Sequence, residues 1–117
     1  MSKRPIELLL SDMRQAIDRI EQYIEDLSFD GFSDDRKSVD AVVRNLEIIG
    51  EAAKRLPEDF KEKHSGIEWH KVVGLRHRIV HEYFGIDLEI IWQILQRDLP
   101  ELKQKIQQII TAEGMDL

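Results

Sequence analysis

The chain has 117 residues, no cysteine and a formal net charge of −6 at pH 7. This length fits one domain, which we place at residues 1–117 with a core at about 5–112, and the missing cysteines exclude disulfides and thiolate zinc sites. No apolar run approaches the ~20 residues that span a bilayer, and no signal-peptide pattern is present, so we expect a cytoplasmic protein without membrane contact.

Apolar residues recur at three- and four-residue spacing through the first half of the chain, which predicts amphipathic helices. The pair Asp30-Gly31 predicts a turn after the first helix. Pro57 is expected to end the second helix, because proline cannot continue it. The helices expected in this half cover residues 5–27, 34–56 and 58–63.

The second half of the chain shows the same periodicity. Asp87 is expected to cap a helix, and Asp98 with Glu101 resembles a capping box at the start of the last one. The helices expected here cover residues 68–81, 88–97 and 99–112. Long helices, short loops and the lack of any strand pattern predict an all-α, up-and-down helical bundle.

Charge is unevenly distributed along the chain. Residues 5–35 carry nine acids and two bases, whereas residues 61–81 carry five bases and two acids. The second window also contains all four histidines, His64, His70, His77 and His81. A local basic site on an acidic body can bind RNA at a defined place, or it can dock an acidic partner.

The most informative segment is 74–84, which reads Gly-Leu-Arg-His-Arg-Ile-Val-His-Glu-Tyr-Phe. On an ideal helix, Arg76 falls in the middle of the apolar stripe and His81 at its edge. A permanent cation there is costly unless it is paired or faces a polar cleft, so one interpretation is a structural ion pair. The alternative is phosphate-ester chemistry, which the titratable His81 and the phenol of Tyr83 favour.

These residues also resemble a known family. The order Arg76, four residues, His81, one residue, Tyr83 is similar to the Arg-x4-His-x-Tyr pattern of the HepT-like toxins, a branch of the HEPN superfamily of helical bundles. The upstream segment 46–55, Leu-Glu-Ile-Ile-Gly-Glu-Ala-Ala-Lys-Arg, is similar to that family too. The resemblance covers roughly residues 5 to 110.

The resemblance implies a metal-independent endoribonuclease that cleaves RNA through attack of its own 2′-hydroxyl. Arg76 would hold the phosphate and His81 would act as general acid or base, and the product would be a 2′,3′-cyclic phosphate. HEPN nucleases build a composite cleft from two subunits, so a homodimer is implied. No cofactor is expected.

The resemblance also implies a partner. HepT-like toxins are typically paired with a minimal nucleotidyltransferase antitoxin that adenylylates the motif tyrosine, here Tyr83. The added AMP would block the cleft by bulk and charge. The competing interpretation is a HEPN module without catalysis that only scaffolds a nucleotidyltransferase.

Neighbouring residues have open assignments. Glu51 either orients Arg76 or pairs with Arg55 one turn away, and Glu47 is the second candidate acceptor. His77 and His81 are four residues apart, but without cysteines or a suitably placed acid they make a poor metal set. Arg78 is expected to face solvent or to make an outer RNA contact. The two tryptophans, Trp69 and Trp92, are expected in the core or a dimer contact.

Overall fold

The computed structural model describes residues 5–75, 77–79 and 87–117. In this part of the chain every regular element is a helix, which confirms the predicted all-α bundle. The elements are α1 (Ile6–Ile24), α2 (Phe29–Asp34), α3 (Arg36–Arg55), α4 (Glu58–Lys63), α5 (Trp69–Val73), α7 (Leu88–Gln93), the π-helix η1 (Ile94–Asp98) and α8 (Leu99–Ala112).

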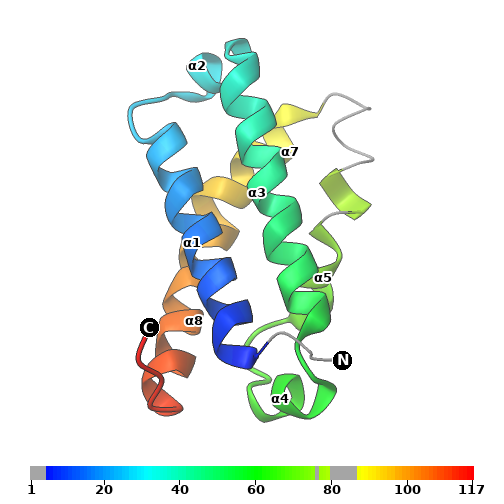
Figure 1. Cartoon of the computed structure of the whole chain (residues 1–117). Helices are drawn as coiled ribbons and strands as arrows, with labels where there is room; N and C mark the ends of the chain where they lie inside the picture. The colour runs from blue at the N-terminus through cyan, green and yellow to red at the C-terminus, as the bar shows by residue number, and fades with distance from the viewer. Residues whose placement is uncertain (1–4, 76, 80–86) are drawn as a thin grey trace.

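The two longest helices, α1 and α3, run antiparallel and side by side through the middle of the molecule (Figure 1). The chain passes from one to the other at one end of the bundle through α2, and it turns again at the opposite end through α4. Helix α5 packs against α3, and α8 packs against α1. No helix among the described residues is long and apolar enough to cross a bilayer.

The apolar stripes explain this arrangement. On α1 the stripe includes Met13, Ile17 and Ile20, and on α3 it includes Leu46 and Ile49; all five are fully buried. Burying each such side chain stabilises the fold by about 1.5–3 kcal/mol relative to exposure. Since both stripes are continuous over several turns, the two helices pack along their whole length.

The predicted turn at Asp30-Gly31 is wrong. These residues lie inside α2, because the Ser28 hydroxyl oxygen accepts a hydrogen bond from Gly31 N at 3.1 Å and caps the helix. Helix α3 begins in the same way, with Asp35 Oδ1 accepting from Ser38 N at 3.3 Å. The hydrogen bond from the Ser38 hydroxyl, and after it the one from the Ser38 backbone N–H, lower the pKa of Asp35 below its ordinary value of 3.8.

The predicted capping box at Asp98 and Glu101 is also wrong. Asp98 has helical backbone angles and its side chain makes no cap, so helical backbone continues from α7 through η1 into α8. Leu99 N–H donates to Ile94 O, five residues back, as a π-helix requires. The physical reason is Pro100, which has no N–H and crowds the carbonyl four residues before it; the wider π turn relieves this crowding.

The predicted helix over 68–81 is interrupted. Helix α5 ends at Val73, and Gly74 adopts turn angles of φ −74° and ψ −6° before Leu75 and residues 77–79 resume helical structure. A Cβ on Gly74 would lie 3.1 Å from His70 O, so the close turn favours glycine. The single helical wheel used for the prediction therefore does not hold across residue 74. Residues 80 and 81 lie outside the described residues.

Candidate functional site

The three motif residues, Arg76, His81 and Tyr83, lie outside the described residues, so their roles stay predictions. Their described neighbours form two faces. Leu75 and Ile79 are buried in the core, while His77 and Arg78 are exposed. Arg78 N–H donates to Gly74 O at 2.9 Å and thus fixes the backbone of this turn. The exposure of Arg78 confirms the prediction that its side chain faces away from the apolar stripe.

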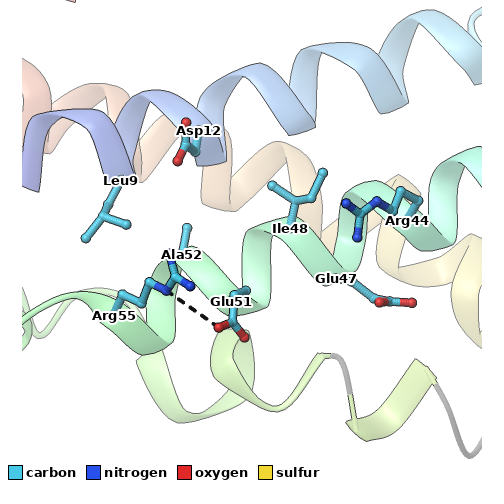
Figure 2. Close-up of a pocket in the computed structure, with 8 residues that line it drawn as sticks. All are labelled: Leu9, Asp12, Arg44, Glu47, Ile48, Glu51, Ala52 and Arg55. Atoms are coloured by element: carbon cyan, nitrogen blue, oxygen red, sulfur yellow. Dashed lines mark ion pairs between the residues drawn. The ribbon is translucent and has the colours of Figure 1, made fainter. Parts of the chain in front are cut away.

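The predicted support residues on α3 border a hollow of about 380 Å³ between α1 and α3. Figure 2 shows Leu9 and Asp12 reaching toward it from α1, while Glu47 and Glu51 extend on the far side of α3. Arg55 Nε lies 3.6 Å from Glu51 Oε1, so the helical ion pair that the spacing allowed is present. Both partners are about half exposed, and pairs of this kind contribute at most about 1 kcal/mol.

Glu47 differs from Glu51 in this respect. It makes no ion pair or hydrogen bond among the described residues, although it is only partly exposed. Its carboxylate therefore has unused acceptor capacity on the face of α3 that is turned away from α1. Whether Glu47 or Glu51 orients Arg76 stays a prediction.

A second hollow, of about 340 Å³, lies between α5 and the η1–α8 segment; we call it the α5–α8 cleft. Its floor is apolar and consists of Ile67, Val72, Leu75, Ile94, Leu99 and Leu102. Its rim is charged and consists of Glu68, Lys71, Arg78, Asp98, Glu101 and Lys105. The sequence assigned Asp98 and Glu101 to a capping box and gave Lys71 and Lys105 no role, because the cleft joins segments that are far apart in the chain.

The two lysines of this rim are neutralised locally. Lys71 Nζ lies 2.6 Å from Glu68 Oε2, and Lys105 Nζ lies 2.9 Å from Glu101 Oε1. Lys105 also donates to Gly66 O at 2.8 Å. The hydrogen bond and charge of Glu68 raise the pKa of Lys71, and Lys71 in turn lowers the pKa of Glu68. Both ion pairs are local, whereas the hydrogen bond from Lys105 to Gly66 joins the two sides of the cleft.

A third polar cluster, which the sequence did not predict, joins the end of α8 to the loop after α4. Glu113 Oε2 lies 2.8 Å from Lys63 Nζ and 2.7 Å from His64 Nε2. The hydrogen bond from Lys63 has the largest effect on the pKa of Glu113 and lowers it, and the hydrogen bond with His64 lowers it further. Trp69 Nε1 donates to His64 O at 3.0 Å, so the same loop is tied to α5.

The two tryptophans have packing roles. Trp69 is buried, and the ring of Trp92 lies 5.2 Å from that of Phe32 and 6.2 Å from that of Phe29. This confirms the prediction that the two tryptophans pack in or against the core. In the described ranges no three histidine, aspartate or glutamate side chains cluster closely enough to hold a metal ion.

In the described residues, fold and site together define a small all-helical bundle with one charged hollow between α1 and α3 and a second one that Arg78 borders. The chain belongs to the ribonuclease HepT-like family, whose model matches residues 13–109. The family resemblance predicted from the motif is thereby confirmed.

Individual relatives support the same assignment. The chain is 39% identical over 107 residues to a Thermococcus cleftensis protein named "Probable ribonuclease HepT", with 92% of this chain and 97% of the relative covered. It is 40% identical over 117 residues to a "Putative RNase" of Methanocaldococcus jannaschii, with 99% and 97% covered. It is 39% identical over 108 residues to a "Putative RNase" of Caldanaerobacter subterraneus, with 92% and 93% covered. No solved structure matches the chain.

Proposed function

We propose that this protein is a metal-independent endoribonuclease and the toxin of a cytoplasmic toxin–antitoxin pair. The observation that carries the proposal is membership of the HepT-like ribonuclease family over residues 13–109, a range that contains the complete Arg-x4-His-x-Tyr motif. Relatives named as ribonucleases, aligned over nearly their whole length, support RNA as the substrate.

The proposed mechanism uses the nucleophile that RNA carries. His81 takes the proton from the 2′-hydroxyl or gives a proton to the departing 5′-oxygen. The 2′-oxygen attacks phosphorus and the bond from phosphorus to the 5′-oxygen breaks, which leaves a 2′,3′-cyclic phosphate and a 5′-hydroxyl. Arg76 binds the non-bridging oxygens with its planar guanidinium and stabilises the charge that develops on them. No step requires a metal ion.

One Arg76 and one His81 make a sparse site. A two-fold dimer that joins two copies across one cleft would supply a second arginine and a second histidine, so that one histidine accepts a proton while the other donates one. We therefore propose a homodimer as the active form.

Tyr83 is the proposed control point. A nucleotidyltransferase antitoxin would transfer AMP from ATP to the Tyr83 hydroxyl, with release of pyrophosphate. The added phosphate would compete with the substrate phosphate for Arg76, and the nucleoside would fill the cleft. Tyr83 lies two residues after His81, which supports its access to the same site.

Cleavage is tested with the purified protein and RNA in the presence of EDTA. We expect cyclic-phosphate products from the wild type and none from Arg76→Ala or His81→Ala. Matched controls are Arg97→Ala and His70→Ala, which remove side chains of the same types at exposed positions that are not part of the motif. If chelation stops cleavage and a divalent cation restores it, the mechanism is wrong. If no variant and no wild type cleaves, the scaffold interpretation replaces the nuclease.

The switch is tested by intact-mass analysis after incubation with the cognate nucleotidyltransferase, ATP and Mg²⁺. The wild type should gain one adenylyl group and lose nuclease activity. Tyr83→Phe should gain none and stay active. Tyr23→Phe is the matched control, because Tyr23 is exposed on α1 and should not affect the modification. Equal modification of Tyr83→Phe and wild type would exclude Tyr83 as the site.

A further inference from the structure

The α5–α8 cleft combines an apolar floor with two charged side chains that have no ion-pair partner among the described residues. Four of its six rim charges form the pairs Glu68–Lys71 and Glu101–Lys105. The side chains of Arg78 and Asp98 make no ion pair or hydrogen bond within the described part of the chain. A ligand that enters this cleft therefore meets one guanidinium and one carboxylate to which residues 5–75, 77–79 and 87–117 offer no partner.

Both charged side chains lie on the rim of the same cleft, and so does Lys71. Arg78 comes from the segment that follows Gly74, and Asp98 is the last residue of η1. The ligand would thus bridge the motif-bearing segment and the π-helix.

The π-helix is the second unusual feature of this cleft. A π-helix is rare, and short π segments occur often at functional sites. Here η1 supplies Ile94 to the floor and Asp98 to the rim. Because the backbone continues in helical conformation through Asp98, its carboxylate is not used as a helix cap and stays available to a ligand.

We propose that the α5–α8 cleft binds one nucleotide unit of the RNA strand, outside the cleaved bond. A base packs on the floor formed by Val72, Leu75 and Leu102. The guanidinium of Arg78 binds the phosphate through two hydrogen bonds, and Asp98 accepts a hydrogen bond from an exocyclic amino group of the base. The choice of RNA rests on the proposed function, since this cleft would be a second contact for the same strand.

The shape of the cleft favours a nucleotide over a protein segment. Its volume of about 340 Å³ is at the lower end for small-molecule sites, and its floor is short. A helical partner segment needs a longer apolar groove with anchors over several turns. A nucleotide offers the three features that the cleft can satisfy together, namely a flat apolar ring, an anion and N–H donors.

The test measures binding of a short RNA in which every 2′-hydroxyl is methylated, so that cleavage cannot contribute. Arg78→Ala should weaken binding about tenfold. Arg97→Ala removes the same charge from the exposed surface of η1 without touching the cleft, and it should weaken binding by no more than about threefold. Equal losses for the two variants would mean that only general electrostatics is involved and would overturn the proposal.

Asp98→Asn tests the base contact, because it keeps the size of the side chain and removes its charge. Overall affinity should rise slightly with the lost repulsion, so the readout is a ratio. Wild type should prefer an oligocytidine over an oligouridine, since cytosine has an amino group where uracil has a carbonyl, and Asp98→Asn should reduce this preference. An unchanged ratio contradicts the role of Asp98.

Two further experiments complete the test. The first distinguishes a free nucleotide from an RNA strand as the ligand, and the second distinguishes failure of the cleft proposal from failure of the nuclease proposal. If free cytidine monophosphate binds to the wild type as tightly as the RNA does, the cleft is a site for free nucleotides and the RNA subsite is overturned. Cleavage is measured separately with unmodified RNA. If Arg78→Ala loses more RNA binding than Arg97→Ala but the wild type does not cleave RNA, the cleft proposal is supported and the nuclease proposal fails. If the wild type cleaves RNA but the two variants lose binding equally, the nuclease proposal is supported and the cleft proposal fails.

Discussion

The α1–α3 pair and the α5–η1–α8 side of the molecule are packed differently. Helices α1 and α3 have 19 and 20 residues, and their central apolar residues are 0% exposed. Helix α5 has five residues, a turn follows it at Gly74, and η1 interrupts the α-helical pattern opposite. Four apolar residues there keep some exposure, at 8% for Trp69, 9% for Val72, 8% for Leu75 and 8% for Leu102.

This difference in packing identifies α1 and α3 as the scaffold of the molecule and the α5–η1–α8 side as a surface that can bind a ligand. The central apolar residues of the two long helices are fully buried, so these helices make a rigid support even though they leave a hollow of about 380 Å³ between them. Short elements that meet at a glycine turn and a π turn cannot close over each other, and the opening that they leave is the α5–α8 cleft. Binding residues are commonly held on such irregular segments by a rigid scaffold.

The largest expected effect is on the free energy of unfolding, when a leucine is replaced by alanine in each of the two regions. Leu46→Ala removes a fully buried side chain of α3 and should lower the free energy of unfolding by about 3–5 kcal/mol, because a closed cavity remains. Leu102→Ala removes a side chain at the edge of the cleft, where water can enter, and should cost only about 2 kcal/mol.

Urea unfolding of both variants, monitored by circular dichroism, measures this difference. The slope of the free energy against denaturant should stay the same in both, which shows that only stability has changed. Equal losses for Leu46→Ala and Leu102→Ala would mean that the cleft is closed in solution, and the contrast between the two regions would fail.

The scaffold was largely predictable from the sequence, and the cleft was not. The stripes of α1 and α3 repeat over about five turns each, so their periodicity alone located both helices. In contrast, α2 depends on a single cap from Ser28 that outweighs the cost of Gly31 in a helix. The cleft depends on how segments around residues 70 and 100 meet, and no local pattern encodes that contact.

The candidate site divides in the same way. Its family was recognisable from the spacing of Arg76, His81 and Tyr83, because this spacing is a local feature of the sequence. The ion pair of Glu51 with Arg55 followed from helical spacing. A capping box was predicted at Asp98 and Glu101 because their spacing before Pro100 resembles a helix start, but it is absent. The π turn that carries the helix past Pro100 has no sequence signature.

A second prediction concerns Asn45, a polar residue that is buried within the α1–α3 scaffold. Asn45 on α3 is buried, its Nδ2 donates to Ala41 O at 2.8 Å, and its Oδ1 has no partner within the described part of the chain. Asn45→Asp should lower stability by about 2–3 kcal/mol at pH 7, because a carboxylate is buried there without a donor.

The pH dependence identifies the cause of this loss. Burial raises the pKa of the introduced carboxyl in the folded state, so the penalty grows as the pH rises above the unfolded value of about 4. Below it, the protonated group can donate to Ala41 O as the amide does. Chemical denaturation at pH 7 and pH 4 should therefore show a smaller difference from wild type at pH 4. A loss independent of pH would indicate altered packing instead.

The smallest expected effect lies at the end of α8, where the scaffold meets the loop after α4. Lys63 and His64 lower the pKa of Glu113, so their contacts stabilise the fold above the ordinary glutamate value of 4.5, and this stability is lost as the pH falls through the lower folded pKa. Glu113→Gln should therefore lower the melting temperature by roughly 1–3 °C at pH 7 and by almost nothing at about pH 3, since ion pairs with an exposed side chain such as Lys63 contribute little. Glu62→Gln is the matched control, because it removes the same charge from an exposed position on α4 without an ion pair in the described ranges.

Thermal unfolding of both variants at the two pH values separates the local contact from the change in net charge. If Glu62→Gln lowers the melting temperature as much as Glu113→Gln at pH 7, the cluster adds nothing specific, and α8 is held by its apolar stripe and by the contacts of Lys103 with α1.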